Sequence, residues 1–172
     1  MRDHRRLLAL RYVAVIAGAA TAISLGPTPA RAHTPANVTK ERAHVKQRAR
    51  SALGSPYRYG GTSKSGFDCS GFTMWTFDRH GASLPHNAMQ QWNLAKRRGY
   101  RRVWKRSRLR RGDLVFHKTT SARVGHAGIY IGHGKFISAT SSEGVRVRSI
   151  WDKYYWGPRY RGAVRVPALR GG

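Results

Sequence analysis

The chain has 172 residues and a formal net charge of +26 at pH 7, with 33 Lys and Arg against seven Asp and Glu. This length is typical of one domain that can bury a hydrophobic core, and the single cysteine, Cys69, excludes a framework of intramolecular disulfides. So strong a positive charge favours a polyanionic partner, which leaves nucleic acid, an anionic membrane surface and a cell wall as candidates.

The first 32 residues have the three parts of a secretory signal peptide. They contain a basic start, an apolar run over residues 12–25 and the sequence Ala30-Arg31-Ala32. The alternative is an uncleaved membrane anchor, but a helix needs about 20 apolar residues to span a bilayer. We therefore expect a secreted, extracytoplasmic protein without a membrane span. Cleavage removes five of the 33 basic residues and one of the seven acidic ones, which leaves 28 against six, a net charge of about +22.

Residues 33–38 are predicted to form a short tail, residues 39–168 a single domain and residues 169–172 a second tail. A first helix is expected from Thr39 to about Leu53, with Val45 and Ala49 on its apolar face and Gly54 as a left-handed stop.

Two further helices are expected before any long strand. Asp68 is a suitable N-cap for a helix from Cys69 to about His80, which Gly81 closes. A third helix is expected after residue 85, with Asn87 as its cap and Gly99 near its end.

From residue 109 onward, short apolar runs rich in Val, Ile, Phe and Tyr alternate with turns. We expect strands at residues 113–117, 125–131, 135–140, 145–149 and 160–166, with a tight hairpin at residues 132–134. Helices followed by strands indicate an α+β fold in which the helices pack on an antiparallel sheet of five to six strands.

Cys69 is the first candidate for chemistry. A thiol attacks a carbonyl as thiolate, and the N-terminus of a helix lowers the pKa of a cysteine. The residues around Cys69, from Gly66 to Gly71, are mostly small or polar, which favours a nucleophile over a buried structural cysteine.

A nucleophilic cysteine needs a base, usually a histidine oriented by a third polar group. His126 begins an apolar strand, where its ring can project toward the terminus of a helix. A histidine on a strand is more often a core residue with its hydrogen bonds satisfied, so His126 gains weight only together with Cys69.

Four strings in this order resemble the NlpC/p60 family of papain-like cell-wall cysteine peptidases. They are Gly54-Ser55-Pro56-Tyr57-Arg58-Tyr59-Gly60-Gly61, Phe67-Asp68-Cys69-Ser70-Gly71-Phe72, Leu109-Arg110-Arg111-Gly112-Asp113-Leu114-Val115-Phe116 and His126-Ala127-Gly128-Ile129-Tyr130-Ile131-Gly132. The resemblance covers about residues 40–166.

The resemblance implies a papain-like α+β domain that hydrolyses peptidoglycan stem peptides, of the D-glutamyl/diaminopimelate type, through a thioester and without a metal or cofactor. It makes Cys69 the nucleophile, His126 the base and Tyr57 a residue that orients the site or the oxyanion. Asp68 and Ser70 would line the pocket for the free amine of the substrate, and His86 stands where relatives often carry an arginine near the substrate.

The third catalytic position, commonly a histidine twelve residues after the base, is Ser138 in this chain. Serine can hold a histidine through one hydrogen bond, but its side chain is shorter and can require a bridging water. With serine at this position, the catalytic site is either weaker than in relatives or uses another residue to orient His126.

Two further features stand outside these motifs. Aromatic residues gather at Trp151, Tyr154, Tyr155, Trp156 and Tyr160, where core packing is favoured over a groove for glycan or peptide. Basic residues form short clusters between residues 97 and 111, which serve either as a solvated surface or as a docking patch for anionic wall polymers.

The leading hypothesis is a monomeric peptidoglycan endopeptidase. An amidase of the same fold and a non-catalytic wall-binding or regulatory protein are the alternatives. A nucleic-acid partner is not expected, because charge is its only support and no nucleic-acid-binding module is recognisable.

Overall fold

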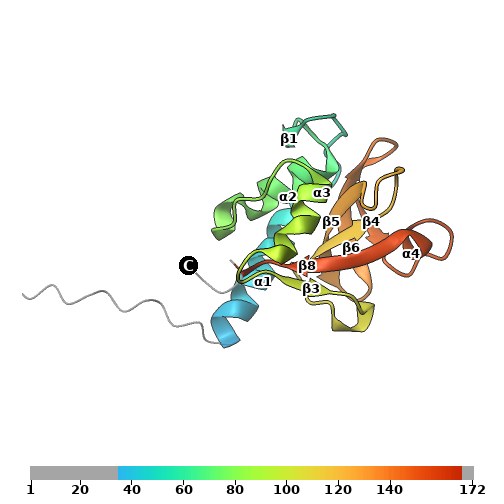
Figure 1. Ribbon diagram of the computed structural model, residues 1–172. Coiled ribbons are helices and arrows are strands. Elements are labelled where there is room, and N and C mark those ends of the chain that lie inside the picture. The colour runs from blue at the N-terminus through green and yellow to red at the C-terminus, as the bar shows by residue number, and fades with distance from the viewer. Residues whose placement is uncertain (1–34, 168–172) are drawn as a thin grey trace, which may run out of the picture. The chain divides into compact units, whose positions relative to one another are not determined.

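The computed structural model describes residues 35–167, and its secondary structure runs from helices to strands as expected (Figure 1). The predicted signal peptide, residues 33–34 and the predicted tail 169–172 lie outside the described residues. The helices are α1 (Pro35–Arg50), α2 (Cys69–Phe77), α3 (Ala88–Asn93) and α4 (Trp156–Arg159), with short 3₁₀ turns at η1 (Asp78–His80), η2 (Leu94–Lys96) and η3 (Arg106–Arg108).

Six strands form one antiparallel sheet in the order β3-β8-β4-β5-β6-β7. They are β3 (Arg101–Val103), β4 (Leu114–His117), β5 (His126–Gly132), β6 (Lys135–Thr140), β7 (Gly144–Ser149) and β8 (Tyr160–Arg165). A separate two-stranded ribbon, β1 (Thr62–Ser63) and β2 (Gly66–Phe67), precedes α2. The prediction of an α+β fold with five to six antiparallel strands is confirmed.

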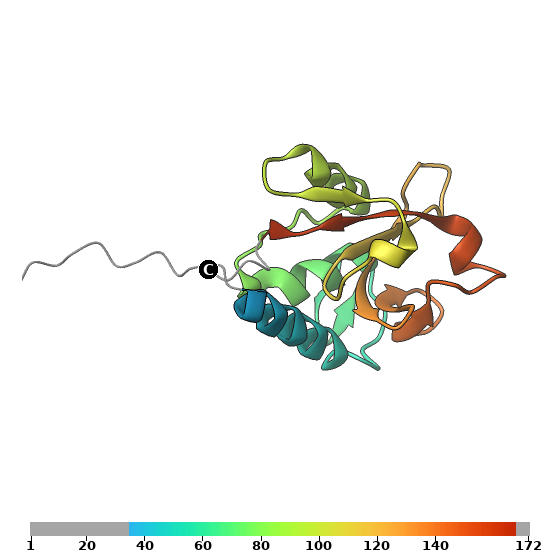
Figure 2. The ribbon, with the colours of Figure 1, turned by 90° about the horizontal axis from the view of Figure 1, so that it is seen from below.

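The strand sequences alternate between two buried faces. On β5, Ala127, Ile129 and Ile131 join the larger core with the helices, whereas Tyr130 packs into a smaller cluster that includes Phe136 and Trp156. Figure 1 and Figure 2 show α1, α2 and α3 gathered beside one face of the sheet, with β8 running between β3 and the other strands. Alternate residues of one strand therefore serve different cores, which places His126, two residues before Gly128, on the face of Tyr130.

The first helix differs from its prediction at both ends. It begins at Pro35, where proline is favoured because its missing N–H has no intrahelical partner, so Thr39 lies inside the helix and residues 35–38 are not a tail. It ends at Arg50, and Leu53 lies in the following turn with a side chain that is 39% exposed. Gly54 does take the expected left-handed conformation, with φ of 86°.

Most other elements follow the predictions closely, but the third helix is shorter than expected. Helix α3 ends at Asn93 and η2 at Lys96, before Gly99, because Arg97 takes an extended conformation. Asp68 caps α2, Asn87 caps α3, and the helix that starts at Cys69 continues as η1 to a left-handed Gly81. The hairpin between β5 and β6 is formed as expected by residues 132–134, with His133 at φ 51°. Strand β3 was not predicted. It has three residues, of which two are arginines and only Val103 is buried, so it lacks the apolar run that marks the other strands.

Candidate active site

Cys69 opens α2, and Asp68 sets the position of that first turn. One Asp68 carboxylate oxygen accepts hydrogen bonds from the backbone N–H of Gly71 at 2.6 Å and from the Ser70 hydroxyl at 2.9 Å. The other oxygen accepts from the N–H of Gly60 at 3.0 Å. Asp68 therefore holds the helix terminus and the preceding loop together, and Cys69 lies where they meet.

Burial decides the acidity of the nucleophile in the free protein. Desolvation raises the pKa of the Cys69 thiol, and backbone N–H groups of Ala127, Ser70 and Cys69 itself lower it by less. The nearby Asp68 carboxylate raises it further. The expectation of a depressed pKa at the helix N-terminus is therefore wrong for the unliganded protein, because loss of water outweighs the hydrogen bonds from the backbone N–H groups.

His126 is the first residue of β5 and is almost completely buried, with 6% of its surface exposed. Its ring packs against Trp156, with ring centroids 4.9 Å apart. Burial, followed by the charge of Arg148, lowers the pKa of His126 to about 3, so the imidazole is neutral at pH 7. A neutral imidazole has a free lone pair that can accept a proton, and its low pKa makes it a weaker base than an exposed imidazole.

One pocket of about 610 Å³ contains both candidate groups. Tyr57, Cys69 and His126 line it together, although they come from a loop, a helix terminus and a strand start. The Cys69 charge also raises the pKa of the Tyr57 hydroxyl, after the larger effect of burial, which places the two groups close together. The nucleophile, the base and the orienting tyrosine expected from the sequence thus share one cavity.

Several residues of this pocket were not predicted. Thr119, Thr120, Gly125, Ala139, Thr140, Ser141, Ser142, Glu143, Arg148, Tyr155 and Trp156 complete its lining. Arg148 donates to Thr140 at 2.7 Å and pairs with Glu143 at 2.6 Å, which places a cation in the pocket. These residues lie in loops and at strand ends, where no periodicity marks them, and only the sheet order brings them together.

The aromatic residues near the end of the chain do not all have the same role: some pack in the core, and others are exposed or line the pocket. Trp156 is 9% exposed and packs in the smaller core, but it also reaches the pocket beside Tyr155. Trp151 and Tyr154 are 59% and 79% exposed, so core packing is wrong for these two side chains.

Asp68, Ser70 and His86, which were predicted to bind substrate, form one hydrogen-bonded cluster. His86 Nε2 lies 2.8 Å from the second Asp68 carboxylate oxygen. The lining of the Cys69 and His126 pocket does not include these three residues, so they lie next to that cavity rather than in it. Their role toward the amine of a substrate stays a prediction.

Ser138 does not hold His126 in this structure. The Ser138 hydroxyl and His126 Nε2 are both buried and have no hydrogen-bond partner among protein atoms. Ser138 lies beside Gly128, since a Cβ placed on that glycine would be 3.1 Å from the Ser138 Cβ. The expected neighbourhood of the two strands is formed, but the hydrogen bond is not.

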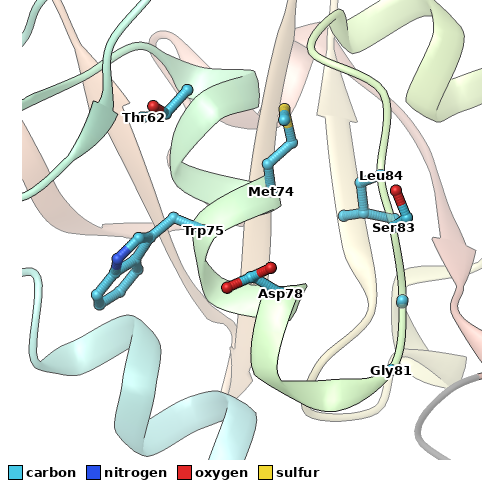
Figure 3. A pocket seen from close by; sticks show the side chains of 8 residues that line it. Thr62, Met74, Trp75, Asp78, Gly81, Ser83 and Leu84 are labelled. Carbon is cyan, nitrogen blue, oxygen red and sulfur yellow. The ribbon is translucent and has the colours of Figure 1, made fainter.

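A second pocket, of about 470 Å³, lies along the later turns of α2 (Figure 3). Met74, Trp75 and Asp78 project from the helix, and Ser83 and Leu84 lie on the segment that faces them. Its lining contains neither cysteine nor histidine, so it is not a candidate for thiol chemistry.

A third pocket, of about 610 Å³, is strongly basic. It is lined by Arg101, Arg102, Val103, Trp104, Lys105, Ser107, Arg108, Leu109, Arg110 and Arg165. Arg165 is neutralised by Asp113, to which it donates two hydrogen bonds of 2.9 and 2.8 Å, and no acidic residue lines the pocket. Part of the predicted basic clusters thus forms a concave cationic surface together with Arg165.

Comparison with known proteins gives consistent matches to one family. The model of the NlpC/P60 family matches residues 54–165. The chain is 41% identical over 114 residues to the murein DD-endopeptidase/murein LD-carboxypeptidase MepS of Escherichia coli, covering 66% of this chain and 56% of MepS. It is 39% identical over 126 residues to the probable endopeptidase NlpC of Escherichia coli, covering 72% of this chain and 77% of that protein.

A solved structure of an NlpC/P60 family protein from Bacillus cereus superposes with a TM-score of 0.63 at 28% identity, covering 82% of this chain and 41% of that one. The chain thus spans about half the length of MepS and of the Bacillus cereus protein.

Proposed function

Since the chain belongs to the NlpC/P60 family, we propose that it is a cysteine endopeptidase that hydrolyses peptide bonds of peptidoglycan. The observation that carries the proposal is the single pocket that contains Cys69, His126 and Tyr57. The name of MepS, a murein DD-endopeptidase, supports peptidoglycan as the substrate class.

The pocket geometry supports acyl transfer through a thioester. As a substrate carbonyl approaches, the Cys69 thiol gives its proton to His126 while the sulfur attacks the carbonyl carbon. Because His126 Nε2 is sealed in the protein, we assign the proton to Nδ1. The C–N bond then breaks, His126 returns the proton to the leaving amine, and water hydrolyses the thioester to regenerate the thiol.

Concerted transfer suits the free protein better than a stored thiolate–imidazolium pair. Burial raises the pKa of Cys69 and lowers that of His126, so both groups are neutral before the substrate binds. The backbone N–H groups at the start of α2 can stabilise negative charge on the sulfur or on the tetrahedral oxygen as it develops. Tyr57, which lines the same pocket, would orient that oxygen.

The bond we favour is the D-glutamyl–diaminopimelate bond of the stem peptide, with the acidic and hydroxyl groups of Asp68 and Ser70 near the substrate amine. A specific alternative is the DD cross-link between stems, because MepS, at 41% identity, is named for that activity. The proposed location of action is the cell wall. The described residues include no helix long and apolar enough to cross a membrane.

The basic pocket supports a second contact with the wall. We propose that its arginines and lysine hold anionic wall polymers and so keep the enzyme on its substrate. This would make surface charge the means of targeting.

The decisive test is digestion of purified peptidoglycan by the protein and by Cys69→Ala, with the soluble fragments identified by mass. Release by the wild type alone of stems cut after D-glutamate supports the favoured bond, and loss of dimers without that cut assigns the DD cross-link. Release of whole stems from the glycan would reveal an amidase. If no fragments are released from several types of peptidoglycan, the proposed enzymatic activity is wrong, and the result supports a wall-binding protein.

A further inference from the structure

A second histidine, His117, lies directly beside the proposed base. It is the last residue of β4, and its Cα is the register partner of His126 on β5. Residues directly opposite in an antiparallel pair point to the same face, and the two rings have centroids 6.2 Å apart. His117 on β4 is therefore a direct neighbour of His126 on β5, and Ser138 lies on β6, the strand on the other side of β5.

His117 is fully buried and is held by aromatic rings on three sides. It stacks on Phe136 at 4.9 Å and meets the edges of Trp156 at 5.1 Å and Tyr160 at 5.8 Å. A ring enclosed in this way has little rotational freedom. It can therefore offer a polar atom in a fixed place.

Unpartnered polar atoms concentrate around this ring. Both His117 nitrogens, His126 Nε2, the Ser138 hydroxyl and the Tyr160 hydroxyl are buried without a hydrogen-bond partner among protein atoms. Most buried polar groups in proteins are paired, so each exception calls for an explanation. Five such atoms, one on the proposed catalytic base and four on His117, Ser138 and Tyr160, indicate a hydrogen-bond network that forms in the working state.

We propose that His117 is a positioning residue for His126, accepting a hydrogen bond from its Nε2–H and so keeping Nδ1 directed at Cys69. This inference rests on the proposed thiol chemistry and deepens it. His117 would take over the task that Ser138 does not perform here.

The distance is compatible with this role. Two imidazole rings joined by a direct hydrogen bond have centroids roughly 5 Å apart, so 6.2 Å requires either a shift of the His126 ring by about 1 Å or one bridging water. Hydrogen bonds in unliganded active sites are often long and tighten when the substrate binds. Tyr160 can complete the network, since it is the register partner of His117 on β8.

His117 also has the protonation state that an acceptor needs. The groups that face it are His126, Arg106 and the Tyr160 hydroxyl, and no carboxylate lies among its ring contacts. Burial, then the neighbouring charges of His126 and Arg106, lower the pKa of His117 well below its usual value. The ring is therefore neutral when His126 takes a proton from Cys69, and it can share the developing charge.

The test compares His117→Phe with the wild type in two assays. The first is the rate of Cys69 alkylation by iodoacetamide between pH 5 and 9, with His126→Phe as the baseline for a thiol without its base. The second is kcat and KM on a soluble muropeptide that the wild type cleaves. We expect alkylation near pH 7 to fall toward the His126→Phe rate, kcat to fall by about 10- to 100-fold and KM to change less than about twofold.

Three further variants separate positioning from packing. His117→Gln keeps an acceptor and should retain more activity than His117→Phe. Ser138→His in the His117→Phe background supplies a histidine from the other neighbouring strand and should recover at least about tenfold in kcat. His44→Phe, at an exposed position on α1, should change neither assay.

The outcomes distinguish this inference from the proposed function. Wild-type alkylation no faster than that of His126→Phe, with no muropeptide cleaved, would overturn the thiol chemistry itself. Fast wild-type alkylation that His117→Phe leaves unchanged would overturn the role of His117 alone. If His117→Phe lowers the thermal midpoint, kcat is compared at a temperature where every variant is folded. There, His117→Gln no more active than His117→Phe, together with no recovery by Ser138→His, would overturn the role of His117.

Discussion

At the scale of single residues, the candidate site depends on groups whose ordinary charges burial suppresses. Cys69 and His126 are each shifted toward their neutral forms, and His117 beside them is also held neutral. The pair of Cys69 and His126 therefore carries no separated charge until the substrate displaces water and the proton moves. The same burial has a consequence for stability, because histidines that cannot be protonated in the folded state can be protonated in the unfolded chain.

We expect the protein to lose stability between pH 7 and pH 5. His126 has a folded pKa of about 3 against an ordinary value of 6.5, so in this window the unfolded chain binds the proton and the folded protein does not. The free energy of unfolding should fall by about 2 kcal/mol from His126, and His117 adds a loss in the same direction. Urea unfolding at both pH values measures this change. His117→Phe combined with His126→Phe should flatten most of the slope, and an equal slope in that variant would contradict the assignment.

Gly71 shows how closely the loop before α2 approaches the helix. A Cβ at this position would overlap the carbonyl oxygen of Gly61 and come within 3.1 Å of His86 Nε2. We expect Gly71→Ala to destabilise the fold by about 1–3 kcal/mol and to lower activity more than tenfold, because the displaced loop also carries Tyr57. Thermal unfolding and muropeptide cleavage measure both effects.

Gly54→Ala is the matched control for Gly71→Ala. Its Cβ would meet no atom within 4 Å, but its φ of 86° costs a residue with a side chain about 1 kcal/mol. It should therefore lower stability slightly and leave activity nearly unchanged. Equal activity losses in the two variants would mean that the close approach at Gly71 does not position the site.

At the scale of elements, one buried carboxylate joins three parts of the chain. Asp113, at the start of β4, is fully buried and accepts two hydrogen bonds from Arg165 of β8 and one from the N–H of Arg110. Arg42 of α1 lies 3.7 Å from the same carboxylate and donates to the carbonyl of Arg111 at 2.7 Å. Asp113 therefore fixes α1 and β8 relative to β4, at the end of that strand opposite to His117.

We expect Asp113→Ala to destabilise the protein by about 3–5 kcal/mol, because it leaves the Arg165 guanidinium partly buried without its anion. At a temperature where the variant is folded, kcat should change less than about threefold, since the contact is remote from Cys69. Asp78→Ala removes an exposed carboxylate from η1 and should cost less than about 0.5 kcal/mol. A loss as small for Asp113→Ala would show that Asp113 does not join these elements.

The elements were predictable from sequence to the extent that local signals define them. Asp68 and Gly81 mark the ends of the Cys69 helix by their own side-chain and backbone chemistry, and residues 132–134 mark the hairpin. His117 could be assigned only to a strand, because its position beside His126 depends on the register between β4 and β5. Arg148 could not be assigned to the pocket from sequence for the same reason, because its position depends on the pairing of β6 with β7.

At the scale of the whole molecule, positive charge is in large excess, and part of it is gathered in one pocket. With residues 1–32 removed, the chain carries a net charge of about +22, and six basic side chains line one pocket at β3 and η3. Only one of them, Arg165, pairs with an acid in the described residues around that pocket. Guanidinium groups bind phosphate and carboxylate oxygens well, so a concave group of them favours a polyanion over a neutral glycan.

We expect binding of the catalytically inactive Cys69→Ala protein to intact cell walls to weaken by roughly a hundredfold between 50 and 200 mM salt, because several ion contacts form together. Neutralising Arg101, Arg108 and Arg110 to Ala should weaken wall binding at 50 mM salt by about tenfold or more. Neutralising Lys46, Arg50 and Lys135, which lie around a different pocket, changes the net charge equally and should weaken binding much less. Equal losses in the two triple variants would assign retention to net charge alone, and salt-independent binding would exclude an electrostatic docking surface.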